Sequence, residues 1–98
     1  MNSMPLPDLH QADLDADTLD QLFADIGQLT QVIEVLPKYR QRNYTPDTPI
    51  SLDEARDLLR DGTVCGLQIR YIHNDAQWWD TLMPAPNGMR LVRIRHDL

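Results

Sequence analysis

The sequence predicts a small α+β domain in which two helices pack on one face of an antiparallel meander of three or four strands, in the order α-(β)-α-β-β-β. Two capping signals, each followed by an apolar stripe at helical spacing, predict the helices. From Thr63 onward apolar and polar residues alternate, which is the pattern of half-buried strands. Two turn signals divide this stretch into three strands.

The first helix is expected to begin at Thr18, because Thr18 and Gln21 have the spacing of a capping box. Gly27 is expected to end it, since glycine readily adopts the positive φ found beyond a last helical turn. The residues of its apolar stripe are Leu19, Leu22, Phe23 and Ile26.

Residues 29–36 fit two structures. The apolar residues continue the helical spacing, but the density of β-branched residues favours a strand, and we expect a helix followed by a strand. Pro37 is expected to end either element. The polar, proline-containing stretch Lys38 to Pro49 is expected to be a loop.

The second helix has the clearest local signal of the chain. Ser51 and Glu54 form a full capping box, and Gly62 is expected to close the helix. The predicted buried stripe comprises Leu52, Ala55, Leu58 and Leu59, with Asp57, Arg60 and Asp61 facing out.

The two turns allow the strands to be paired. A tight turn at Asn74-Asp75 places Tyr71 opposite Trp78 and Arg70 opposite Trp79. A longer loop over Pro84 to Gly88 then places Met83 opposite Met89 and Trp79 opposite Arg93. In this register the apolar face, which is expected to receive the helices, carries Leu67, Ile69, Tyr71, Trp78, Leu82, Val92 and Ile94.

The opposite, open face is the candidate binding surface. It is predicted to carry Arg70, Trp79, Arg93 and Arg95, with the indole of Trp79 between the guanidinium groups of Arg70 and Arg93. Tryptophan and arginine are the residues most enriched in interface hot spots. A cluster that only keeps the open face soluble is the alternative interpretation.

Asp80 is expected to lie on the apolar face of the same sheet. A carboxylate is costly there unless it is paired, and Arg90 on the neighbouring strand is its expected partner.

Charge and length suggest one domain with an acidic end. We expect residues 1–16 to be a flexible acidic tail and residues 17–98 of the 98-residue chain to form a single domain. The net charge is −6, and residues 1–37 contain no Lys or Arg. Their seven acids are Asp8, Asp13, Asp15, Asp17, Asp20, Asp25 and Glu34.

Several classes of protein do not fit the sequence. With Cys65 as the only cysteine, no intramolecular disulfide can form, and the N-terminus lacks the features of a signal peptide, so we expect a cytoplasmic protein. Cys65 is expected to be a core thiol on the apolar face. No catalytic, nucleotide-binding or metal-binding motif is present, so we expect no cofactor and no metal.

The preferred function is that of a non-catalytic accessory, regulatory or assembly factor that binds another protein through the open sheet face. Homodimerisation through this face stays open, and neither a membrane nor a nucleic acid is expected as partner. One alternative is an inhibitor whose acidic N-terminal third mimics nucleic acid. Another is a small enzyme or enzyme subunit that uses Asp80, Tyr71 and an arginine.

Overall fold

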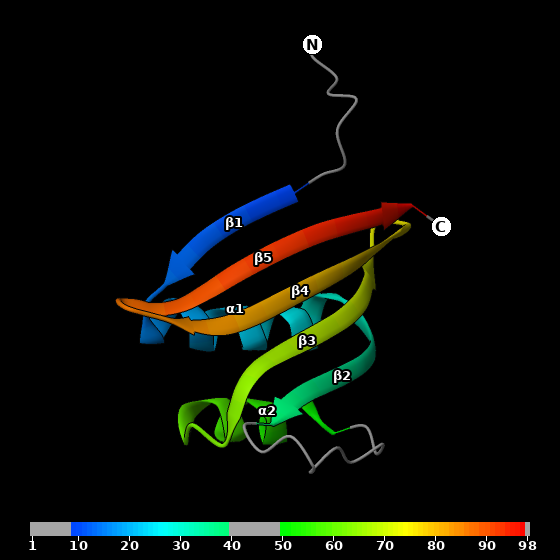
Figure 1. Ribbon diagram of the computed structural model, residues 1–98. Coiled ribbons are helices and arrows are strands. Elements are labelled where there is room, and N and C mark those ends of the chain that lie inside the picture. Colours follow the sequence, from blue (N-terminus) through cyan, green and yellow to red (C-terminus); the bar gives the residue numbers. More distant parts are fainter. Residues whose placement is uncertain (1–8, 40–49, 98) are drawn as a thin grey trace.

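A five-stranded antiparallel sheet with the strand order β1-β5-β4-β3-β2 is the framework of the protein. The structure, a computed structural model, describes residues 9–39 and 50–97 (Figure 1). The elements, in chain order, are β1 (Leu9–Leu14), α1 (Ala16–Leu29), β2 (Gln31–Tyr39), α2 (Leu52–Arg60), β3 (Val64–His73), β4 (Ala76–Ala85) and β5 (Gly88–Asp97). The α+β class is confirmed, but the sheet has more strands than predicted.

The helix α1 connects the two edges of the sheet. It leaves β1 at one edge, passes behind the sheet and enters β2 at the other edge (Figure 1). The shorter helix α2 contacts α1, β2 and β3. Neither helix is long and apolar enough to cross a membrane. The helices share one core with the sheet, built around Phe23, Ile26, Ala55, Leu59, Val35, Leu67, Ile69 and Leu82.

The first helix begins earlier and ends later than expected. Asp15, not Thr18, is its N-cap: the Asp15 carboxylate accepts a hydrogen bond of 2.8 Å from the backbone N–H of Thr18. Hydrogen bonds from Thr18 also lower the pKa of Asp15. The helix continues through Gly27 and ends at the C-cap Thr30, whose hydroxyl donates to the Ile26 carbonyl at 2.7 Å. The predicted stop at Gly27 is therefore wrong, because glycine is tolerated inside a helix whose stripe is buried.

The strand predicted after this helix is confirmed as β2, although Pro37 does not end it. The strand continues to Tyr39, so the first two residues of the predicted loop belong to it, and residues 40–49 of that prediction lie outside the described part of the chain. Because β2 pairs only with β3, it is an edge strand, and an edge strand tolerates the missing N–H of proline.

The segment predicted as a tail contributes a strand. Residues Leu9–Leu14 form β1, which pairs with β5. Leu9 lies opposite Ile94 at one end of this pairing, and Leu14 lies opposite Met89 at the other end. The side chains of residues 10–13 are exposed, and Leu14 is buried in the core. The sequence of β1 shows no alternation of apolar and polar residues, so it gives no strand signal. The strand forms because its backbone pairs with the free edge of β5.

The second helix agrees closely with its prediction. The Ser51 hydroxyl accepts a hydrogen bond of 3.1 Å from the N–H of Glu54, as the capping box requires. Ala55 and Leu59 are buried, and Gly62 follows the helix with a φ of +76°.

The register of β3 against β4 is confirmed. Asn74 and Asp75 form the two-residue turn with positive φ at both positions, and Arg70 pairs with Trp79 and Ile69 with Asp80.

The register of β4 against β5 differs from the prediction by one residue. The turn contains only Pro86 and Asn87, so Ala85 pairs with Gly88 and Pro84 with Met89. The pairing between β3 and β4 ends where Leu67 lies opposite Leu82, so Pro84 has no partner on β3. The missing N–H of proline is therefore tolerated at this position. The loop predicted over Pro84 to Gly88 is therefore wrong.

This one-residue shift exchanges the two faces of β5. Arg93 and Arg95 lie on the helix-covered face, opposite Asp80 and Trp78, while Val92 and Ile94 lie on the open face. The predicted positions of all four side chains are wrong, whereas the predicted faces of the β3 and β4 residues are correct.

Gly88 is essential to this hairpin for two reasons. Its φ is +143°, and a Cβ at this position would overlap the carbonyl oxygen of Leu14. The glycine thus allows the start of β5 to approach the end of β1.

We expect Gly88→Ala to lower the free energy of unfolding by about 2–4 kcal/mol, because it adds backbone strain and a steric overlap. Urea denaturation followed by circular dichroism measures this loss. Gly62→Ala is the matched control: its φ is also positive, but no atom lies within 4 Å of the added Cβ. It should cost only about 1 kcal/mol, and equal losses in the two variants would contradict the steric role of Leu14.

Candidate functional site

Trp79 lies near the centre of the open sheet face, on the middle strand β4. The guanidinium carbon of Arg70 lies 3.9 Å from the centroid of its ring. On the other side of the indole, the centroid of the His96 ring lies 4.1 Å from the centroid of the Trp79 ring. The indole N–H donates to Gln77 at 3.2 Å. The indole is therefore held in one orientation, with a cation on one side and an imidazole on the other.

Arg70 is already neutralised on this face. Its Nη1 donates to Glu34 Oε1 at 2.9 Å, and its Nε donates to Gln68 Oε1 at 2.9 Å. Gln68 in turn donates to the hydroxyl of Thr81 at 3.2 Å. Because guanidinium, carboxylate and amide are joined in one network, Arg70 orients Trp79 more than it attracts an anion.

The rest of the open face is mixed in character. Arg90 lies near the β1 edge and is paired with Asp13 at 3.1 Å. The apolar residues of this face include Ile72, Val92 and Ile94, which are half-buried, and Met83, which is 37% exposed. An apolar centre with charge-neutral flanks has the composition of a protein-binding surface.

Only half of the predicted site is assembled there. Arg70 and Trp79 meet as expected, but Arg93 and Arg95 lie on the opposite face because of the shifted register of β5. Ile94 takes the position opposite Trp79 that was predicted for Arg93, and His96, two residues further along β5, makes the ring contact. The buried Nε2 of His96 has no hydrogen-bond partner among the described residues.

The second feature is a buried ionic network around Asp80, which has no exposed surface. Its two carboxylate oxygens accept hydrogen bonds of 2.8 Å from Nε and Nη2 of Arg93. The hydroxyl of Tyr71 donates to the same carboxylate at 3.0 Å. The predicted partner Arg90 is wrong, since the register places Arg93 directly opposite Asp80.

This network raises the pKa of Tyr71 and of Arg93. Burial, followed by the charge of Asp80, raises the pKa of Tyr71 above its ordinary value of 10.0. The hydrogen bonds to Asp80 raise the pKa of Arg93. Tyr71 thus stays protonated and Arg93 stays charged over the neutral range, which is typical of a structural network and not of a proton-transfer site.

Arg95 approaches the other tryptophan. Its guanidinium carbon lies 5.9 Å from the ring centroid of Trp78, and the ring of His10 lies 6.5 Å from the same indole. The Trp78 indole donates to the carbonyl of His73 at 3.3 Å. Trp78 packs against the core, so this cluster covers the end of the core beside β5.

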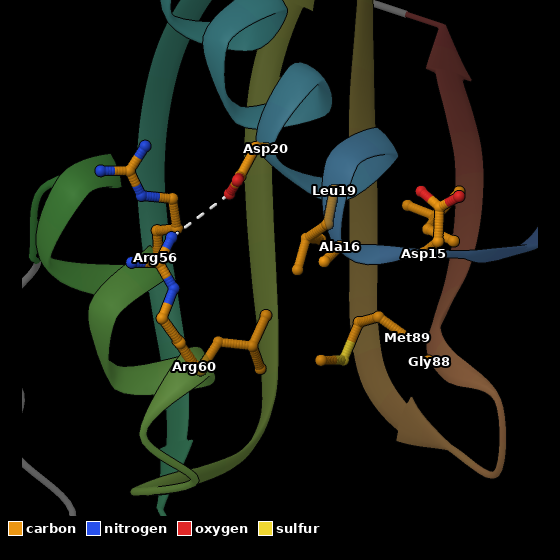
Figure 2. A pocket seen from close by; sticks show the side chains of 10 residues that line it. Asp15, Ala16, Leu19, Asp20, Arg56, Arg60, Gly88 and Met89 are labelled. Atoms are coloured by element: carbon orange, nitrogen blue, oxygen red, sulfur yellow. Dashed lines mark hydrogen bonds and ion pairs between the residues drawn. The ribbon is translucent and has the colours of Figure 1, made fainter.

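A cavity of about 260 Å³ is the third feature, and it lies between the first turn of α1, one side of α2 and the start of β5 (Figure 2). On its rim Arg60 contacts Asp20 at 3.4 Å, as the dashed line in Figure 2 shows. Arg56 also lines it. Sequence patterns do not reveal this cavity, because it depends on how three distant segments are packed.

The structure places Cys65 differently from the prediction. It is only half-buried, and it lies where the β2–β3 register is irregular, with its Sγ 3.9 Å from the Tyr39 carbonyl. Within residues 9–39 and 50–97, no group of three His, Cys, Asp or Glu side chains is arranged to hold a metal ion.

Removing the charge of Asp80 tests the structural role of the network. We expect Asp80→Asn to lower the free energy of unfolding by about 3 kcal/mol, because the half-buried Arg93 loses its counter-charge and the buried carboxylate is replaced. Urea denaturation measures the change. Asp13→Asn, in the exposed pair with Arg90, is the control and should cost less than about 1 kcal/mol. A loss no larger than that of the control would contradict the buried pairing.

The raised pKa of Tyr71 predicts a stability that falls at alkaline pH. The unfolded chain releases the phenolic proton near pH 10 while the folded chain retains it, so this contribution is complete below about pH 10 and is lost as the pH rises further. The loss approaches about 1.4 kcal/mol per pH unit. Denaturation at a series of pH values between 9 and 11.5 should show a shallower decline for Tyr71→Phe than for the wild type. Parallel curves would contradict the prediction.

Comparisons with known proteins give no further guidance on the site. No family model matches the chain, and no curated protein and no solved structure is significantly similar to it.

Proposed function

We propose that the protein is a non-catalytic binding protein, an accessory, regulatory or assembly factor, and that it binds another protein through the open face of its sheet. The observation that carries this proposal is the outward-facing Trp79, held between Arg70 and His96 near the middle of a sheet face opposite the helix-packed core. A large aromatic that is fixed in advance loses little conformational entropy on binding and is a typical interface anchor.

The chemistry of the face favours a partner with an apolar patch. Both arginines that the described residues place there, Arg70 and Arg90, already have carboxylate partners at 2.9 and 3.1 Å. An acidic partner would have to displace Glu34 or Asp13 to reach them. The apolar side chains of this face need no such exchange, and covering them releases water at no electrostatic cost.

The role of a nucleic-acid mimic is less well supported. Such a mimic needs free, regularly spaced negative charges, but Asp13, Asp20 and Glu34 are each paired with an arginine. Asp15 is committed to capping α1. The acidic N-terminal third is thus partly neutralised by the arginines of the remainder.

An enzyme built on Asp80 is also less well supported. Its carboxylate is fully buried and accepts from both Arg93 and Tyr71, so it offers no exposed oxygen to a substrate. The described cavity is lined by none of these three residues.

The proposal predicts that Trp79→Ala folds but loses its partner. The substitution removes contacts to two side chains on the sheet face that the two described helices do not cover, which should cost about 1 kcal/mol of stability. Affinity purification of tagged protein from its native cells, followed by quantitative mass spectrometry, should show partner recovery reduced at least about tenfold, as for a hot-spot residue. Val92→Arg, on the same face, should have a similar effect.

Leu29→Ala is the control, because Leu29 is 65% exposed but lies at the end of α1, away from the open face. This variant should recover the partner as the wild type does. Unchanged recovery by Trp79→Ala and Val92→Arg would overturn the proposal. Removing residues 1–8 alone keeps β1 intact, and loss of the partner on that truncation would point instead to this N-terminal segment.

A further inference from the structure

The two edge strands of the sheet, β1 and β2, differ in the backbone groups that their outer sides present. Figure 1 shows β1 at one edge, beside β5, and β2 at the other edge, beside β3. The outer side of an edge strand carries backbone N–H and C=O groups that can pair with a further strand. The residues that carry these groups follow from the hydrogen-bond pattern of the two hairpins.

On β1, every second residue directs its backbone groups away from the sheet. In a two-residue hairpin the residues that flank the turn form a hydrogen-bonded pair, and such pairs alternate along an antiparallel ladder. Gly88 flanks the second turn, so the even-numbered residues of β5 bond to β4 and the odd-numbered residues bond to β1. Their partners on β1 are His10, Ala12 and Leu14. The backbone N–H and C=O groups of Leu9, Gln11 and Asp13 therefore point outward.

The outer side of β2 is obstructed. The same alternation, followed from the first hairpin through β3, directs the backbone groups of Val35 and Pro37 outward. Pro37 has no N–H to donate there, and the register is irregular between Val32 and Glu34, as at a β-bulge. Prolines and bulges are two of the means by which proteins prevent pairing at a sheet edge.

The outer side of β1 has neither obstruction. Its six residues include no proline, and its register against β5 is regular. The side chains of residues 10–13 are exposed, and no described strand pairs with this side. Asp13 is the only Asp, Glu, Lys or Arg of the strand, and Arg90 balances its charge at 3.1 Å. The edge is therefore open, and it has little charge to repel an identical edge.

A second copy of the chain presents a complementary edge. Two β1 strands that run antiparallel about a two-fold axis at Gln11 place Gln11 opposite Gln11 of the second copy and Leu9 opposite its Asp13. All the outward-pointing residues then lie in hydrogen-bonded pairs, and each pair exchanges two backbone hydrogen bonds. The two Asp13 carboxylates lie toward opposite ends of the pairing. A shift of the register toward Asp13 would leave Leu9 unpaired and bring these carboxylates together.

We propose that two copies of the chain form a dimer through the outer edge of β1, so that their five-stranded sheets join into one antiparallel sheet. The pairing uses the open edge of both copies, and the obstructed β2 edge prevents further growth, so the assembly closes at two copies. The two-fold axis is perpendicular to the sheet, which turns both open faces to the same side. With the function proposed above, the dimer presents two copies of Trp79 to one partner surface.

Sedimentation velocity of the full-length protein, from micromolar to millimolar concentration, tests the dimer. The interface is small, so we expect a reversible equilibrium, with monomer at the low and dimer at the high concentration. Amide hydrogen exchange at the same two concentrations locates the contact. The amides of Gln11 and Asp13 should exchange at least about tenfold more slowly in the dimer, whereas those of Ala12 and Leu14, which bond to β5, should slow far less.

Two substitutions at one position test the role of the backbone. Gln11→Pro removes the outward N–H at the two-fold axis, but it keeps the hydrogen bonds between β1 and β5, because Gln11 takes no part in them. This variant should stay monomeric at millimolar concentration. Gln11→Ala keeps the N–H and is the matched control, and it should dimerise as the wild type does. Trp79→Ala, on the open face, should also dimerise. Circular dichroism reports whether each variant is folded.

A protein that stays monomeric at millimolar concentration overturns the proposal, as does equal exchange of the Gln11 and Asp13 amides at the two concentrations. Dimerisation of folded Gln11→Pro as in the wild type overturns it too, and a dimer lost only in Trp79→Ala places the contact on the open face instead. If Gln11→Pro does not fold, the exchange comparison decides. A monomer can still bind a partner protein through Trp79, so a failure here leaves the proposed function standing.

Discussion

Asp80 is the residue on which the arrangement of the sheet depends. It is fully buried on the central strand, and its oxygens are held by Arg93 from β5 and Tyr71 from β3. A shift of β5 by one residue would place Val92 opposite Asp80 and turn Arg93 toward the open face. The buried carboxylate would then lack its cation, at a cost of about 3–5 kcal/mol. The ion pair therefore selects the register, and the register decides which side chains reach each face.

The hairpin at Pro86 and Asn87 selects the same register by a different physical effect. Gly88 allows a two-residue turn, and its missing side chain lets the carbonyl of Leu14 approach. This contact joins β5 to the end of β1, where α1 begins. Backbone geometry at the turn and electrostatics in the middle of the strands thus agree, and such agreement between local and long-range interactions favours a single structure.

The same register gives the two sides of the sheet different chemistry. The open face keeps Trp79 with charge pairs that are already satisfied, which suits a protein with an apolar patch. The helix side has a cavity with mainly apolar walls, and the paired Arg60 and Asp20 lie on its rim. A chain with a net charge of −6 can present both surfaces because many of its acids are engaged in caps and ion pairs.

The sequence by itself determined the features that depend on neighbouring residues. These include the α+β class, the cap at Ser51, the turn at Asn74-Asp75 and the pairing of Arg70 with Trp79, since each needs only a short stretch of chain. Only the tertiary structure decided the rest: the strand β1, the partner of Asp80, the faces of Arg93 and Arg95, and the cavity. These features depend on a free strand edge, a steric contact between Gly88 and Leu14 and the burial of a charge, and each of them joins residues that are far apart in the chain.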